Sequence, residues 1–111
     1  MLVYIMEAHA TDEWPILDTE TTFTQHKTLE ERRRAVEFTC DSYPILESSE
    51  GFGEDHIFLD TIDNHFNTNF SSWPLRYWIL HGGHVAFKAM PREAQYPLCD
   101  LEAALEDIVS V

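Results

Sequence analysis

The first residues of the chain place the strongest constraint on its fold. Leu2, Val3, Tyr4 and Ile5 follow one another without a polar residue between them. A strand with one face in water alternates apolar and polar residues, whereas an unbroken apolar run suits a strand that is covered on both faces, as in a parallel sheet. We therefore expect an α/β fold that begins with an interior strand.

A helix is predicted after a long irregular segment. Residues 7–26 have no regular period and are too long for an ordinary connection, so we interpret them as a candidate functional loop. Thr28-Leu29-Glu30-Glu31 then has the capping-box pattern, in which a Thr hydroxyl and a Glu carboxylate pair with free backbone amides at a helix start. We expect a helix over 29–40, ended by Tyr43-Pro44.

The second half of the chain predicts a strand, a short helix, a hairpin and a final helix. Residues 56–60 form a second short apolar run, and Asp63-Asn64 are expected to cap a helical turn through Phe70. Two apolar runs, 76–80 and 84–88, flank Gly82-Gly83, a turn typical of a tight hairpin. Leu98, Leu101, Leu105 and Ile108 predict an amphipathic helix after Pro97. The predicted order is β-α-β-α-β-β-α.

Length and charge limit the classes of partner. A chain of 111 residues corresponds to one domain, so we interpret residues 1–111 as a single domain. Twenty acidic residues against seven basic ones give a net charge of −13, which argues against nucleic acid and anionic lipid as partners. The basic cluster Arg32-Arg33-Arg34 follows Glu30-Glu31, and we interpret it as a solvated helix face with local ion pairs.

The remaining motifs predict neither a membrane segment nor a metal. No apolar run approaches the length needed to span a bilayer, so we expect a soluble chain, cytoplasmic by default, with its compartment unassigned. Cys40 and Cys99 are far apart in sequence and form neither a C-x-x-C motif nor a disulfide framework. His81 and His84 are two ligands without a third or fourth at diagnostic spacing.

Four segments resemble the iodothyronine deiodinase family. Residues 4–14, YIMEAHATDEW, are similar to the family's Y-I-E-E-A-H-x-S-D-G-W, and residues 25–32, QHKTLEER, to its Q-H-x-S-L-E-D-R. Residues 59–64, LDTIDN, resemble V-D-T-M-D-N, and residues 73–79, WPLRYWI, resemble W-P-E-R-L-Y-V. The four occur in the family's order and extend over nearly the whole chain. The resemblance implies reductive removal of iodide from iodothyronine substrates, with a thiol reductant as co-substrate and no bound cofactor.

The resemblance also implies roles for individual residues. Glu7 and His9 correspond to an acid and an imidazole that relay protons, and His26 to a histidine that clamps the ligand. Arg92 is adjacent to Pro91, the position of the family's clamp arginine, and is therefore the candidate for that role. Pro74 corresponds to the cis-proline of a thioredoxin-like fold. This sequence departs from the family at Leu75, where the W-P-E-R pattern has a glutamate.

The resemblance finally implies an incomplete thioredoxin-like fold. The family's G-S-C-T-[U/C]-P-P segment, which carries the nucleophile, has no counterpart here, so we expect the catalytic strand and helix to be lacking. Without that central strand, residues 2–5 should pair directly with 76–80 or keep an open edge, and a homodimer is a further expectation. One hypothesis is that an upstream selenocysteine codon was read as a stop. The alternative to an enzyme is a redox-dead thioredoxin-like module for binding or dimerisation.

Overall fold

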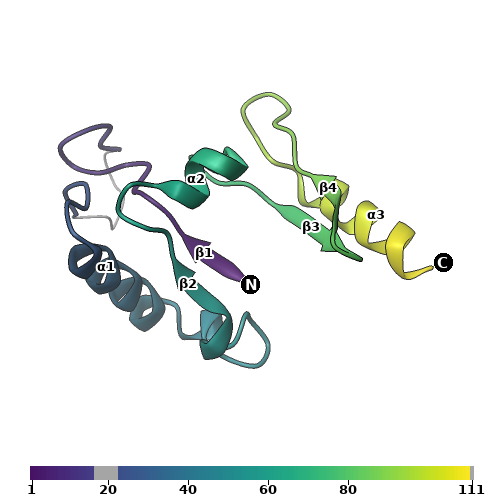
Figure 1. The fold of residues 1–111 in the computed structure, drawn as a ribbon, viewed down its shortest axis with the longest axis horizontal. Coiled ribbons are helices and arrows are strands. Elements are labelled where there is room, and N and C mark those ends of the chain that lie inside the picture. The colour runs from purple at the N-terminus through teal and green to yellow at the C-terminus, as the bar shows by residue number, and fades with distance from the viewer. Residues whose placement is uncertain (17–22, 111) are drawn as a thin grey trace. The chain divides into compact units, whose positions relative to one another are not determined.

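A computed structural model describes residues 1–16 and 23–110, which form two compact units, Met1–Pro74 and Leu75–Val111 (Figure 1). Residues 17–22 of the predicted functional loop lie outside the described parts. The elements follow the predicted order β-α-β-α-β-β-α, so the α/β class is confirmed. They are β1 (Leu2–Tyr4), α1 (Leu29–Ser42), β2 (Ile57–Leu59), α2 (His65–Phe70), β3 (Trp78–His81), β4 (His84–Lys88) and α3 (Leu98–Val109), with short 3-10 turns at Pro44–Leu46 and Glu54–His56.

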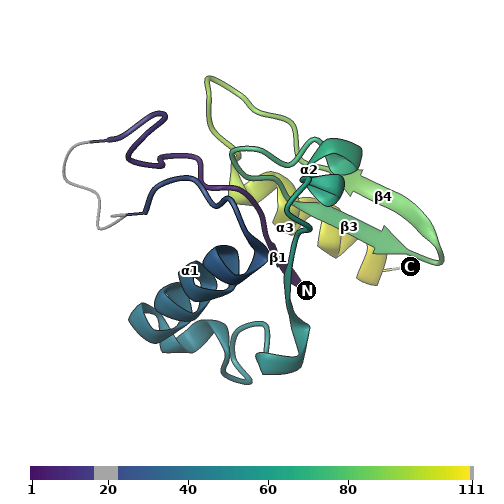
Figure 2. The same ribbon diagram turned by 60° about the vertical axis from the view of Figure 1, so that its left-hand side comes forward.

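The first unit is built on a parallel pair of strands. β1 pairs with β2 in parallel, with Leu2 opposite Ile57 and Tyr4 opposite Leu59. The Asp60 amide donates to the Tyr4 carbonyl at 2.8 Å and so continues the pairing beyond β2. Helix α1 connects the two strands and runs beside them in both ribbon views (Figures 1 and 2). The parallel pairing expected of the first strand is therefore confirmed, whereas the expectation of an interior strand is wrong, because among the described residues β1 is one of two strands in its sheet.

Of the two outcomes expected for the first strand, the structure shows the open edge. We expected residues 2–5 to pair with residues 76–80 or to keep an open edge, and the described strands divide into two two-stranded sheets, β1-β2 and β3-β4. Among the residues that the structure describes, β2 is the sole strand partner of β1. A three-residue pairing with β2 uses one edge of β1, so its second edge lies outside any ladder.

Helix α1 begins as the capping pattern predicts and ends two residues later than expected. The Thr28 Oγ1 accepts a hydrogen bond from the Glu31 amide at 3.1 Å, and the Glu31 carboxylate accepts from the Lys27 amide at 2.6 Å. The carboxylate therefore binds one residue further back than in a standard capping box. One face of the helix is buried through Arg32, Ala35, Val36 and Cys40.

Helix α2 is capped by a different residue from the one predicted. Asn64 precedes the helix in a left-handed conformation, with φ of 60°, and makes no capping hydrogen bond with its side chain. The buried Asp60 carboxylate instead accepts from the amides of Phe66 and Asn67 at 2.8 and 2.9 Å. Asp60 can reach them because the chain reverses between β2 and α2, which a local cap pattern does not encode.

The second unit is a hairpin followed by a helix. β3 and β4 are antiparallel, with His81 opposite His84 and an irregularity between Ile79 and Leu80. Gly82 and Gly83 both have positive φ, 56° and 79°, as a two-residue turn between right-twisted strands requires. Helix α3 starts directly after Pro97, as predicted, and lies beside the hairpin (Figures 1 and 2).

Among the described residues, the buried apolar ones are few and small. They are Ala10, Ala35, Val36, Cys40 and Ala89. Four polar residues of the same described parts, His26, Arg32, Asp60 and Ser72, are buried as well. Buried polar groups are costly unless they are hydrogen-bonded, so their contacts determine much of the local structure of the first unit. In the described parts of the chain, no helix has both the length and the apolar character needed to cross a membrane.

Candidate functional site

Glu7 lies just after β1 and is held through both its side chain and its backbone. The Tyr4 hydroxyl, three residues earlier, donates a short hydrogen bond to the Glu7 carboxylate. The Gln25 side chain accepts from the Glu7 amide at 3.0 Å and donates to the Glu7 carbonyl at 2.9 Å. The backbone of Glu7 is therefore tied to the segment that leads into α1, and its carboxylate has a fixed donor.

His26 faces the same carboxylate from the start of α1. The ring is buried, and its Nε2 lies 3.8 Å from the Glu7 Oε1, too far for a direct hydrogen bond. Within the described residues, that Nε2 has no hydrogen-bond partner. The Tyr4 ring stacks against the imidazole, with 6.0 Å between ring centroids. Tyr4, Glu7 and His26 thus form one group, which we call the Glu7 cluster.

Burial controls the protonation of the Glu7 cluster. Burial lowers the pKa of His26 below its ordinary value of 6.5; the Glu7 carboxylate opposes this shift and the Arg32 guanidinium adds to it. Burial also raises the pKa of Tyr4 well above its ordinary value, and the hydrogen bond to Glu7 raises it further. Tyr4 therefore remains a hydroxyl donor at neutral pH, and His26 favours the neutral imidazole.

Arg32 supports the Glu7 cluster from helix α1. Its side chain is 1% exposed, so the prediction that all three arginines form a solvated face is wrong for Arg32. The guanidinium donates to the His26 Nδ1 at 3.1 Å, to the Thr61 carbonyl at 2.7 Å and to the Asn64 Oδ1 at 3.0 Å. A guanidinium can be buried when its donors are used in this way.

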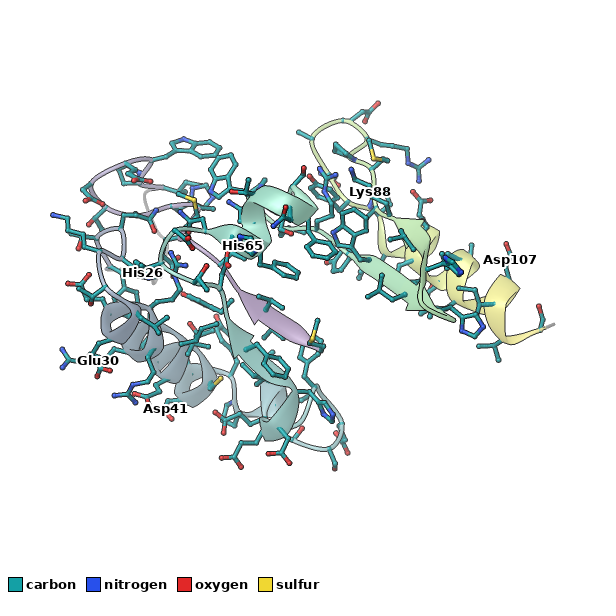
Figure 3. All side chains as sticks on the ribbon, viewed as in Figure 1. His26, Glu30, Asp41, His65, Lys88 and Asp107 are labelled. Carbon is teal, nitrogen blue, oxygen red and sulfur yellow. The ribbon has the colours of Figure 1, made fainter. Side chains whose placement is uncertain are left out.

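The other two arginines behave as predicted. Arg33 forms close ion pairs with Glu30 and Glu37, and the Arg34 Nε lies 3.4 Å from the Glu30 carboxylate. Figure 3 labels His26 at the start of α1 and Glu30 on the outer side of the same helix. The helix therefore carries its ion pairs on one face and its support of the Glu7 cluster on the other.

His9 is placed in an aromatic group and not against Glu7. Its Nδ1 lies 3.1 Å from the Trp14 carbonyl, and the two rings meet edge to face at 4.7 Å between centroids. The Trp14 ring lies 6.0 Å from the Trp73 ring. Both indoles are largely exposed, at 55% and 40%. The Trp73–Pro74 peptide bond that follows this aromatic group is cis.

Arg92 belongs to the second unit and is held in an ion pair. Its guanidinium lies 2.8 Å from the Asp100 carboxylate in the first turn of α3. Two backbone hydrogen bonds with Gln95 close the turn that carries it. The side chain is 62% exposed, so the guanidinium has faces that Asp100 does not occupy.

The two thiols differ in environment. Cys40 is buried on α1, and burial, with a hydrogen bond to Glu47, raises its pKa to about 11. A thiol with that pKa is protonated at neutral pH and is a poor nucleophile. Cys99 is exposed on α3 and free. Over residues 1–16 and 23–110, no three His, Cys, Asp or Glu side chains are grouped to hold a metal ion.

Three residues of the site were missed by sequence reasoning. Tyr4 was interpreted as part of a strand and of a family motif, Gln25 only as part of a family motif, and Arg32 as a surface residue. A signal was available for Arg32: together with Ala35, Val36 and Cys40 it follows the i, i+3, i+4, i+8 spacing of one buried helix face. No comparable period marks Tyr4 or Gln25.

A family model and individual relatives both indicate the same protein family. The family model for iodothyronine deiodinase matches residues 1–109. Thyroxine 5-deiodinase of Ovis aries is 26% identical over 106 residues, which are 96% of this chain and 33% of the relative. Type I iodothyronine deiodinase of Xenopus laevis is 28% identical over 88 residues, 79% of this chain and 31% of the relative. The chain thus spans about a third of the length of these curated relatives. Since the family model extends over nearly all of its residues, this chain belongs to the iodothyronine deiodinase family.

Proposed function

We propose that this chain supplies the proton-handling part of a reductive deiodinase that acts on iodothyronines such as thyroxine. The observation that carries the proposal is the Glu7 cluster: a carboxylate that accepts from the Tyr4 hydroxyl and lies 3.8 Å from the His26 Nε2, in a chain of this family. A half-buried carboxylate with fixed donors is a suitable group for general acid–base chemistry.

The proposed reaction has a simple balance. The bond between a ring carbon and iodine breaks, a carbon–hydrogen bond forms, and iodide leaves. Two thiols, or a selenol and a thiol, are oxidised to a disulfide or a selenenyl sulfide and supply the two electrons. One proton goes to the ring carbon and a second is released. A thiol reductant is therefore a co-substrate in this proposal, and the proton transfers require a group such as Glu7 near the reacting ring.

The remaining candidates have roles in binding. The exposed Trp14 and Trp73 rings, with His9 edge-on to Trp14, offer aromatic faces on which an iodinated ring could stack. His26 and Arg92 are proposed to contact the substrate's polar groups. Arg92 would have to share its guanidinium with Asp100 or leave that ion pair. Of the two assigned proton carriers, Glu7 is supported by its contacts, whereas those of His9 favour ring binding.

A thioredoxin-like fold belongs to the same proposal. Its support is the element order β1-α1-β2-α2-β3-β4-α3 and the parallel β1-β2 pair. The cysteine or selenocysteine nucleophile is proposed to come from a segment other than the two thiols described above, since Cys40 is buried and protonated. The homodimer stays a prediction.

Iodide release from thyroxine with excess dithiol tests the function. Both this chain and a form extended by its upstream coding sequence should be assayed, and the extended form is expected to release iodide. Sequencing upstream for an in-frame UGA in a G-S-C-T-like context would test the selenocysteine hypothesis. No iodide release from either form would contradict the proposal and favour a redox-dead binding module.

A further inference from the structure

The contact between Arg32 and His26 is a buried hydrogen bond with a defined donor and acceptor. The Arg32 Nε donates to the His26 Nδ1 at 3.1 Å, between two side chains that are 1% and 7% exposed. The other guanidinium nitrogens are held by the Thr61 carbonyl and the Asn64 Oδ1, and one of them also lies 3.3 Å from the Asp60 carbonyl. Four contacts, one to His26 and three to residues 60–64, therefore fix the direction of the Nε–H bond.

This contact determines which imidazole nitrogen carries hydrogen. A guanidinium has donors and no acceptor, so the His26 Nδ1 must present its lone pair to Arg32. In a neutral imidazole the hydrogen is then on Nε2, the nitrogen that lies 3.8 Å from the Glu7 Oε1. A second proton on Nδ1 would place two donors and two positive charges face to face in a buried site.

We propose that Arg32 is a positioning residue that holds His26 as the neutral Nε2–H tautomer directed at Glu7. His26 then presents an N–H group toward the carboxylate, 3.8 Å away, and does not carry a second proton. Glu7 becomes the member of the Glu7 cluster that exchanges protons. The assignment of the tautomer stands on the contacts alone, whereas its place in a reaction rests on the proposed function.

The groups around the His26 ring shift its pKa in opposite directions. Glu7 and Glu31 favour a protonated imidazole, whereas burial and Arg32 disfavour it. The Tyr4 hydroxyl faces the ring from β1 and is neutral at neutral pH. The Asp60 carboxylate, which acts on Arg32, is occupied by the amides of Phe66 and Asn67. The direct Arg32 contact to Nδ1 is the element that distinguishes the two ring nitrogens.

Long-range proton–nitrogen correlation spectra of the isotope-labelled full chain test the tautomer directly. His26 signals can be assigned by their loss in His26→Gln. The expected pattern is a bare Nδ1 and a protonated Nε2 at neutral pH, still dominant at about pH 6.5, where an ordinary imidazole is half protonated. A protonated Nδ1, or a fully protonated ring near pH 6, would overturn the proposal. This measurement needs no Arg32 variant and stands even if such a variant fails to fold.

Arg32→Lys keeps the positive charge but removes the planar Nε–H donor. The expected result is a mixture of the two His26 tautomers and a higher midpoint of titration for this ring. The matched control is Arg34→Lys on the same helix, where the side chain is 71% exposed, and its spectrum should keep the parental His26 pattern. A folded Arg32→Lys chain with unchanged tautomer and titration would contradict the positioning role.

The tautomer of His26 can be tested separately from the proposed function, because the spectra are recorded without substrate and without turnover. A chain with the expected tautomer but no iodide release, in any form, would refute the function alone. Iodide release together with a protonated Nδ1 would refute this inference alone.

Discussion

At the scale of single residues, the Glu7 cluster shows how polar groups are kept inside a small protein. Tyr4, Glu7 and His26 come from the end of β1 and the start of α1, and each has a neighbour that restricts its orientation. Gln25 ties the backbone of Glu7 on both its amide and its carbonyl. Removal of one such partner leaves a buried polar group unpaired, which costs more than the hydrogen bond itself contributes.

Tyr4→Phe is expected to lower stability by removing the hydroxyl that donates to Glu7. A hydrogen bond to a charged group contributes about 1.5–3 kcal/mol, so the free energy of unfolding should fall by about 2 kcal/mol. The measurement is urea unfolding at pH 7. Tyr43→Phe is the control, because Tyr43 is 54% exposed and should change stability by less than about 0.5 kcal/mol. If the two variants lowered the free energy of unfolding equally, the Tyr4 hydroxyl would contribute no more to stability than the exposed Tyr43 hydroxyl.

The sequence located part of this site and missed the rest for identifiable reasons. Glu7, His9 and His26 were all found through family motifs. The structure places the His9 ring against Trp14, whereas the Glu7 carboxylate accepts from the Tyr4 hydroxyl. Arg32 was assigned to the surface because it stands in a run of three arginines. Its helical period with Ala35 and Val36 is the stronger signal.

At the scale of elements, the order and type of each helix and strand could be predicted, whereas contacts between distant segments could be predicted only in part. The cap of α1 is local in sequence and was predicted from the Thr28 and Glu31 pattern. The cap of α2 is not local, since Asp60 reaches amides six and seven residues later. Strand partners also depend on contacts between distant segments, so the sequence left two alternatives for β1, and the structure shows the open edge.

Asp60→Ala is expected to destabilise the chain because two amides of α2 lose their acceptor inside the protein. The loss of a helix cap costs about 0.5–2 kcal/mol, and burial places this case near the upper end. Asp63→Ala is the matched control, because Asp63 is exposed and accepts from the Thr61 hydroxyl, whereas the amides of Phe66 and Asn67 are bound by Asp60. In urea unfolding, the free energy of unfolding of Asp60→Ala should be clearly lower than that of Asp63→Ala. The reverse order would support the cap predicted from the sequence.

At the scale of the whole molecule, pH acts on stability through His26 and through a net charge of −13. His26 has a pKa below 6.5 in the folded chain because of burial, so between the two values the unfolded chain binds more protons. Its contribution to stability is therefore complete above about pH 6.5 and is lost as the pH falls. Repulsion among the acidic residues decreases over the same range and acts in the opposite direction.

The variant His26→Gln separates the contribution of His26 to the pH dependence of stability from the contribution of the net charge. The free energy of unfolding of the parental chain should fall more between about pH 7 and about pH 5 than that of His26→Gln, which keeps an acceptor for Arg32 but does not titrate. His84→Gln, at the exposed turn of the β3-β4 hairpin, should behave as the parent does. An identical pH dependence in the parent and in His26→Gln would contradict a buried neutral imidazole.

The most direct test of the account is the rate of iodide release from thyroxine by Glu7→Gln, measured in the form of the protein that turns over. Loss of a general acid–base group lowers a rate by about 100-fold to 10,000-fold, and the account predicts a loss in that range. Glu102→Gln, exposed on α3, should retain the parental rate and serves as the control. A folded Glu7→Gln protein that releases iodide at the parental rate would contradict the assignment of proton transfer to Glu7.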